Sequence, residues 1–332
     1  MMKFDIFSTE FYQVFLHGLH SSLGGKVPDP SFGRRKLPHH PDEEMLRKTC
    51  AYDWAEGLVS VASSRKRVYL QTWSRQGSTP KAEVIMLHGI AAYGGCLAKL
   101  VPGYTAAGLR VHLMDLPGHG RSDGVHADAA SMQRLIRALH GVVQHVKRTH
   151  GGPIYLMGYS LGGLVAIRYC LEHPKDVSGL SLISPCVKLN PAVLRDSSLI
   201  TLARMIAFLT PRLALPSPPR RQRVDTTHSS LTYQQSARIG TLMMILRSTA
   251  QLPQNLSPLQ LPFLVQQGAQ DSMLDPYGAH LLYQLTGSID KLVRIYPEQD
   301  HDMLSCPQIH QDSIDWLSSQ IERQSPCKYR TP

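Results

Sequence analysis

The chain has 332 residues, 42% of them apolar and 18% charged, which is the composition of a folded globular protein and excludes a disordered or collagen-like chain. Its length predicts one large domain with an extension or insertion rather than a string of small modules. The net charge of +10 suits an anionic partner, but the basic residues are scattered without interleaved aromatic residues, so nucleic-acid binding is not expected.

The six cysteines lie far apart and form no Cys-x-x-Cys pair, which predicts free thiols in a reducing compartment and argues against a zinc site. Asp5 and Glu10 argue against a secretory signal or a mitochondrial transit peptide. No stretch has the roughly 20 uninterrupted apolar residues of a membrane span. We therefore expect a cytoplasmic protein.

Residues 1–50 are predicted to form an N-terminal extension, in which four prolines break any long element: Pro28, Pro30, Pro38 and Pro41. Seven later segments show the apolar pattern of buried strands: Val68–Trp73, Glu83–His88, Arg110–Asp115, Pro153–Tyr159, Gly179–Ile183, Pro262–Val265 and Leu292–Tyr296. Helices are predicted between them, most clearly at Ser131–His150 and Leu161–His173. This alternation predicts an α/β protein, with a mostly parallel central sheet and helices on both faces.

The alternation of strands and helices is interrupted after the fifth of these segments. An apolar stretch, Leu199–Leu209, and a helical stretch, Ser236–Leu252, lie in the interruption. We therefore predict that residues 187–257 form an inserted helical cap, and that residues 51–186 and 258–325 form the core.

A candidate nucleophile stands between a predicted strand and a predicted helix, in Gly158-Tyr159-Ser160-Leu161-Gly162. A sharp turn from strand to helix crowds the backbone, so glycines on both sides avoid clashes while the serine hydroxyl is held above the sheet. The pattern therefore indicates that Ser160 is a nucleophile. The alternative is a serine that only caps the helix within a glycine-rich loop.

A serine nucleophile needs a base and a carboxylate that orients the base, and in this kind of fold the acid and then the histidine follow the serine on loops after strands. Asp271 stands just past the strand Pro262–Val265 and is the predicted acid. Asp275 competes for this role, but it precedes Pro276 and an apolar helical stretch, which is typical of a helix N-cap.

His301 follows the strand Leu292–Tyr296 on a short loop and is the predicted base. None of the other 15 histidines follows both the serine and the acid on such a loop, since His310 falls in the predicted final helix. His119 precedes the serine in a glycine-rich turn, and we interpret it as a structural loop residue.

Two backbone N–H groups are expected to stabilise the oxyanion of a tetrahedral intermediate. One belongs to Leu161, directly after the nucleophile, and the other is expected in the loop after the strand Glu83–His88, which nominates Ile90. The alternative is that His88-Gly89 only ends the strand. No metal is expected at this site.

With these motifs the chain resembles the α/β-hydrolase family, and within it the branch of monoacylglycerol lipases and lysophospholipases, which is classed with the serine aminopeptidase-like hydrolases. The resemblance spans residues 55–320 and rests on His88-Gly89-Ile90, the loop Asp115–Gly124, the turn at Ser160, Gly268–Asp271 and Asp300-His301. It implies that Ser160, Asp271 and His301 form a catalytic triad, and that Ile90 and Leu161 form the oxyanion hole.

The resemblance further implies a cofactor-independent serine hydrolase that cleaves carboxylic esters of acyl lipids, with monoacylglycerol preferred. Lysophospholipids, other carboxylic esters and thioesters are alternatives, and a non-catalytic protein that binds lipid or a partner is the alternative of a different class. In this branch the cap forms an apolar entrance for the acyl chain. The stretch Leu199–Leu209, beside Arg220, Arg221 and Arg223, would then either contact a membrane surface peripherally or pack on the core.

Overall fold

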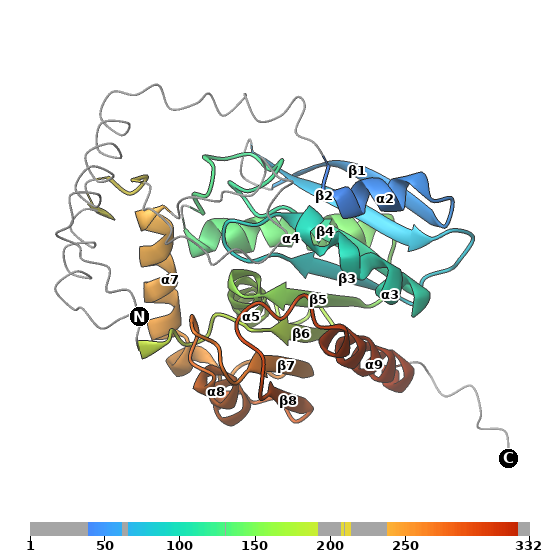
Figure 1. Ribbon diagram of the computed structural model, residues 1–332. Coiled ribbons are helices and arrows are strands. Elements are labelled where there is room, and N and C mark those ends of the chain that lie inside the picture. The colour runs from blue at the N-terminus through green and yellow to red at the C-terminus, as the bar shows by residue number, and fades with distance from the viewer. Residues whose placement is uncertain are drawn as a thin grey trace, which may run out of the picture.

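One sheet of eight strands runs through the protein, in the order β1-β2-β4-β3-β5-β6-β7-β8. Its strands are β1 (Tyr52–Ser60), β2 (Arg67–Arg75), β3 (Ala82–Leu87), β4 (Leu109–Met114), β5 (Ile154–Tyr159), β6 (Gly179–Ile183), β7 (Phe263–Gly268) and β8 (Lys291–Tyr296). The computed structural model describes residues 39–61, 66–129, 131–191, 207–208, 210–213 and 238–324 (Figure 1). The strands from β4 to β8 in this order pair in parallel, whereas β2 pairs antiparallel with both β1 and β4.

Strand β3 explains why the predicted strands are continuously apolar. Its side chains alternate between the two faces of the sheet: Ile85 and Leu87 belong to one buried cluster, and Val84 and Met86 belong to the other. Helices cover both clusters, so neither set of side chains reaches water. The first cluster lies under α4 (Met132–Thr149), α5 (Leu161–Glu172) and α8 (Tyr277–Leu285), and the second under α3 (Val101–Ala106) and α9 (Pro307–Gln324).

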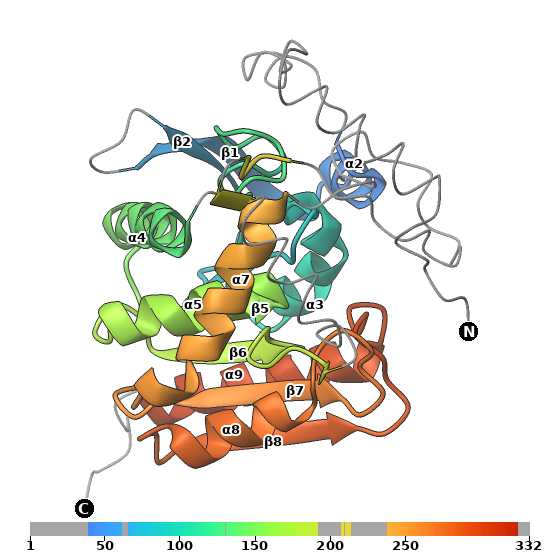
Figure 2. The same ribbon diagram turned by 90° about the vertical axis from the view of Figure 1, so that its left-hand side faces the viewer.

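The predicted α/β fold, with a mostly parallel sheet between two layers of helices, is confirmed (Figures 1 and 2). The seven predicted strands correspond to β2 through β8. Strand β1 was not predicted, because it pairs only with β2 at the edge of the sheet and Val59 is the one buried residue among its nine. Such a strand lacks the apolar run by which the others are recognised.

Helix α7 (Ile239–Gln251) lies in the predicted cap, and it agrees with the helical stretch predicted at Ser236–Leu252. The Thr241 hydroxyl accepts a hydrogen bond from the Ala129 N–H at 3.1 Å and donates one to the Ala127 carbonyl oxygen at 3.2 Å. These contacts place α7 against the loop that follows β4 (Figure 2).

Most of the remaining cap lies outside the described residues. This holds for Arg220, Arg221 and Arg223 and for the stretch Leu199–Leu209, apart from Ala207 and Phe208. The Phe208 side chain is largely exposed. Among the described residues, no helix combines the length and the apolar character needed to cross a membrane.

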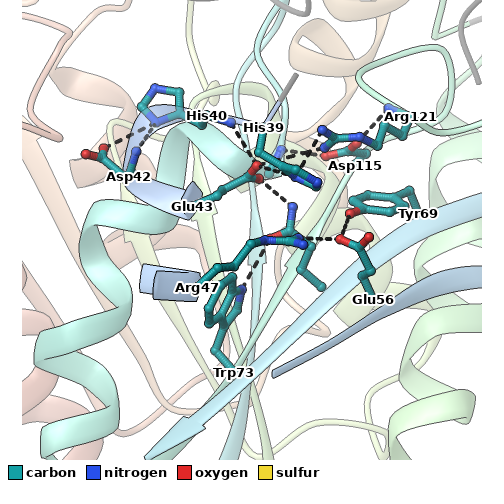
Figure 3. Close-up of polar contacts among 12 residues, drawn as sticks. His39, His40, Asp42, Glu43, Arg47, Glu56, Tyr69, Trp73, Asp115 and Arg121 are labelled. Atoms are coloured by element: carbon teal, nitrogen blue, oxygen red, sulfur yellow. Dashed lines mark hydrogen bonds and ion pairs between the residues drawn. The ribbon is translucent and has the colours of Figure 1, made fainter. Parts of the chain in front are cut away.

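Helix α2 (Pro41–Lys48), which lies within the predicted extension, is joined to the core by a buried carboxylate. Pro41 takes the first helical position, where the fixed φ of proline is favourable. The Glu43 side chain is buried, and its carboxylate accepts hydrogen bonds from the Gln71 amide and from the His40 backbone N–H. Figure 3 shows Glu43 beside His40. The Arg121 guanidinium also lies 4.0 Å from the Glu43 carboxylate.

A second contact from α2 reaches the antiparallel strands. The Arg47 guanidinium pairs with the Glu56 carboxylate on β1, which also accepts a hydrogen bond from the Tyr69 hydroxyl on β2 (Figure 3). The guanidinium carbon of Arg47 lies 4.0 Å from the centre of the Trp54 ring. Both contacts connect α2 to the β1–β2 hairpin.

Candidate active site

Ser160 lies at a strained turn between β5 and α5. Its φ of 53° falls in the left-handed region, which costs a residue other than glycine roughly 1–3 kcal/mol. Two glycines allow the turn to be this tight. A Cβ at Gly158 would lie 2.6 Å from the Gly163 Cα, and one at Gly162 would lie 2.3 Å from the Leu87 carbonyl oxygen. The turn therefore presses the start of α5 against the end of β3.

The structure brings the three predicted triad side chains together. The Ser160 Oγ lies 3.0 Å from the His301 Nε2, and the His301 Nδ1 lies 2.8 Å from the Asp271 Oδ2. A carboxylate can only accept, so the Nδ1–H donates to Asp271 and the Nε2 is left to accept the serine proton. The Asp271 side chain is buried and the His301 side chain is 12% exposed, so this chain of hydrogen bonds runs through a largely dry site.

Asp271 is held by more than His301. Its Oδ1 accepts the backbone N–H groups of Met273 at 2.9 Å and Leu274 at 2.8 Å, and its Oδ2 also accepts the Gln267 amide at 2.8 Å. Four donors on one buried carboxylate fix its orientation. Gln267 carries no signal in the sequence, because its role depends on the bend that follows β7.

Asp275 faces away from this arrangement. Its Oδ1 accepts the Tyr277 N–H at 2.9 Å at the start of α8, and its Oδ2 pairs with the Lys188 ammonium at 2.8 Å. Burial alone would raise the pKa of Asp275, but the hydrogen bonds from Lys188 and Tyr277 lower it below its ordinary value. Asp275 therefore accepts the N–H of the first residue of α8, but the N-cap position belongs to Pro276, so the helix begins one residue later than predicted.

Hydrogen bonds and a ring contact hold the loop that carries His301 in place. Asp300 Oδ1 accepts the Ser272 N–H and the Ser272 hydroxyl, both at 3.0 Å, and the His301 N–H at 2.6 Å. The Ser184 hydroxyl donates to the His301 carbonyl oxygen at 3.2 Å. The Tyr159 ring, with its centroid 5.5 Å from that of His301, packs beside the imidazole. Sequence reasoning missed Ser184, which no motif distinguishes.

The predicted oxyanion donors stand on the two segments that flank Ser160. Leu161 directly follows it as the first residue of α5. Ile90 follows Gly89, at which a Cβ would lie 3.4 Å from the Ser160 Cβ. Ile90 therefore lies on a segment that approaches Ser160 in space, and Leu161 follows Ser160 in the chain. The role of their backbone N–H groups as donors stays a prediction.

His88 fixes the segment that contains Ile90. Its Nδ1–H donates to the Gly89 carbonyl oxygen at 2.7 Å, and its Nε2 accepts the Leu116 N–H at 2.9 Å. Burial lowers the pKa of His88 to about 3, so the ring stays neutral and keeps its acceptor. The hydrogen bond to Leu116 joins the end of β3 to the loop after β4.

His119 lies in that same loop and not in the triad. It is buried, its Nδ1 lies 3.2 Å from the Pro117 carbonyl oxygen, and its ring centroid is 5.2 Å from that of His88. Burial lowers the pKa of His119 to about 4. This neutral packed ring agrees with the prediction of a structural loop residue.

Comparisons with known proteins agree with this fold. The family model described as serine aminopeptidase, S33, matches residues 78–308. Human monoglyceride lipase is 29% identical over 275 residues, which cover 79% of this chain and 88% of that protein. In the crystal structure of the monoacylglycerol lipase of Paleococcus ferrophilus, the match covers 76% of this chain and 99% of the other, with a TM-score of 0.65 at 24% identity.

A second solved structure, of a soluble variant of monoglyceride lipase from Saccharomyces cerevisiae in complex with a substrate analog, matches with a TM-score of 0.66 at 17% identity. It covers 83% of this chain and 97% of the other. At such identities the two structures establish the fold alone, whereas the family model spans most of the chain. The chain therefore belongs to the serine aminopeptidase S33 family and has the α/β-hydrolase fold.

Proposed function

We propose that the protein is a serine hydrolase that cleaves carboxylic esters of acyl lipids, with monoacylglycerol as its substrate and fatty acid and glycerol as its products. The observation that carries the proposal is the chain of hydrogen bonds from Ser160 through His301 to Asp271. The similarity to monoglyceride lipases supports the choice of substrate. A cofactor is not required, because the serine, base and acid supply the chemistry.

In this mechanism the Ser160 Oγ attacks the ester carbonyl carbon while the His301 Nε2 takes the hydroxyl proton. The carbonyl oxygen becomes an oxyanion that accepts hydrogen bonds from the N–H groups of Ile90 and Leu161, each worth roughly 10²–10³ in rate. The imidazolium returns its proton to the departing alcohol, leaving an acyl-serine. Water then attacks the acyl carbonyl carbon while the same imidazole takes its proton. The bond from that carbon to the Ser160 Oγ breaks, the Oγ receives the proton back from His301, and the fatty acid leaves.

Asp271 orients the imidazole and stabilises its charged form during both steps. Its buried carboxylate, held by four donors, suits an acceptor whose orientation stays fixed through both steps. Ser160 argues against the related reactions that need a carboxylate at this turn, namely dehalogenation and epoxide hydrolysis. The apolar residues of the predicted cap disfavour a peptide substrate.

A fluorophosphonate probe and a substrate panel test the proposal. The probe should label the wild-type protein and leave Ser160→Ala unlabelled, whereas equal labelling of both would show that Ser160 is not the nucleophile. Monoacylglycerols should be hydrolysed faster than lysophospholipids, short-chain esters or thioesters. If lysophospholipids were hydrolysed faster, the proposed mechanism would stand and lysophospholipid would replace monoacylglycerol as the proposed substrate. A wild-type protein that is neither labelled nor active would favour the non-catalytic alternative.

The proposal includes peripheral contact of the cap with a lipid surface. Flotation with anionic liposomes at low and high salt tests it, with Arg220, Arg221 and Arg223 neutralised in the comparison variant. Binding should fall at high salt and in the variant. Equal flotation of both proteins would exclude the arginine cluster as an anchor.

A further inference from the structure

Two histidines and an aspartate meet where α4 packs beside the end of α5. His140 belongs to α4, His173 ends α5, and Asp176 follows in the next turn of the chain. The Nδ1 atoms of His140 and His173 lie 3.5 Å and 3.9 Å from the Asp176 Oδ2, and one ligand atom of each residue lies within 4.8 Å of the others. The rings are stacked, with centroids 4.4 Å apart.

These separations are close to those of a tetrahedral metal site. Metal–nitrogen and metal–oxygen bonds of about 2.0–2.1 Å place neighbouring ligand atoms about 3.4 Å apart. Two imidazole nitrogens and one carboxylate oxygen are ligands that zinc and its neighbours in the first transition row prefer. The side chains of His140, His173 and Asp176 are 34%, 32% and 19% exposed, so an ion can reach them from solvent.

The cluster is built on a buried tyrosine. The Tyr169 hydroxyl donates to the Asp176 Oδ2 at 2.8 Å and lies 3.3 Å from the His140 Nδ1. Its ring is in contact with both imidazole rings, at centroid distances of 6.1 Å to His140 and 4.8 Å to His173. Tyr169 itself belongs to the core under α4 and α5. The three ligands therefore rest on a rigid support, as preorganised metal ligands do.

Lys147 forms an ion pair with Asp176 and offers a position at which the charge beside the cluster can be changed. Its ammonium lies 2.6 Å from the Asp176 Oδ1, whereas both histidines face Oδ2. The carboxylate can thus keep its ion pair through one oxygen and offer the other to a metal. The positive charge of Lys147 nevertheless opposes a cation bound so close to it.

We propose that His140, His173 and Asp176 bind one divalent transition-metal ion, with zinc as the reference ion and water completing its coordination. The ion would link α4 to the chain that leaves α5 and so stabilise the folded protein. Ser160 precedes the other end of α5, a helix of 12 residues and thus about 18 Å long. The site is therefore separate from the triad and takes no part in the proposed ester hydrolysis.

The test measures zinc affinity by competition with a chromophoric chelator, and thermal stability with and without zinc, on full-length protein freed of any affinity tag. Wild type should bind one zinc ion, and at a free zinc concentration about 100-fold above Kd its Tm should rise by about 4 °C. Magnesium should leave the Tm unchanged, because two imidazoles and one carboxylate are a poor ligand set for it.

Variants separate this site from other metal-binding residues. His140→Ala and His173→Ala should each weaken zinc binding at least about tenfold, whereas His280→Ala, which removes an exposed histidine of α8, should change nothing. Lys147→Gln should bind zinc roughly threefold more tightly, because it removes the opposing charge. Zinc binding that is absent, or that persists unchanged in both histidine variants, would overturn the proposal.

Discussion

The two aspartates that follow β7 show how contacts, rather than residue type, assign roles. Asp271 and Asp275 are four residues apart, yet Asp271 faces His301 and Asp275 faces Lys188. Chain order and the proline after Asp275 were enough to favour Asp271. The four donors that hold its carboxylate could not be predicted, because they depend on the bend of the loop.

We predict that Asp271→Asn lowers kcat by about 10⁴-fold for whichever ester the protein hydrolyses. An amide beside the His301 Nδ1 can donate to it, which favours the tautomer whose Nε2 carries the proton and cannot accept that of Ser160. Asp275→Asn should keep kcat and lose about 1 kcal/mol of stability, since it weakens the hydrogen bond to the Tyr277 N–H and a half-exposed ion pair. Steady-state kinetics and urea unfolding of both variants check this, and the reverse pattern would make Asp275 the acid.

At the scale of elements, α2 is the part of the fold that the sequence described least well. Its prolines predicted an irregular extension, and an eight-residue helix that begins at the last of them carries too short a pattern to be recognised. Its place is decided by Glu43, whose buried carboxylate accepts hydrogen bonds from Gln71 on β2 and from His40, the residue before the helix. A single glutamate among many gives no such signal in the sequence.

The matched pair Glu43→Gln and Glu44→Gln tests this anchor. Glu43 is buried and Glu44, its neighbour on α2, is exposed. Glu43→Gln should lower the free energy of unfolding by about 2 kcal/mol, because it replaces charge-assisted hydrogen bonds to Gln71 and His40 at unchanged volume. Glu44→Gln should stay within about 0.5 kcal/mol of wild type. Equal stabilities of the two variants, measured by urea unfolding, would show that α2 is not anchored by this carboxylate.

For the whole molecule, buried imidazoles should make stability depend on pH. Burial lowers the pKa of His88 to about 3 and that of His119 to about 4, whereas it raises the pKa of Asp115 to about 7. Between pH 4.5 and 6 the unfolded chain protonates both imidazoles and the folded chain neither, while folded Asp115 keeps a proton that the unfolded carboxyl releases. The two imidazoles outweigh the one carboxyl, and burial lowers the pKa of His112 and His126 in the same sense.

We therefore predict that the free energy of unfolding rises with pH in this window, by at least about 1.4 kcal/mol per pH unit. Urea unfolding at pH 4.5, 5, 5.5 and 6 measures the slope. His119→Gln removes one of the titrating groups and should lower the slope by about 1.4 kcal/mol per pH unit. A stability that falls as pH rises through this window, or a slope unchanged in the variant, would contradict the assignment of neutral buried rings.

By itself the sequence determined the order of strands and helices from β2 to α9, because strands covered on both faces and helices covered on one leave a local pattern of apolar residues. It also nominated Ser160, Asp271 and His301 as the candidate triad, because the motif and the order of residues along the chain can be read from the sequence as well. Tertiary structure alone decided the edge strand β1, the anchoring of α2 by Glu43 and the meeting of His140, His173 and Asp176. Each of these depends on packing between separate elements, which no short stretch of sequence records.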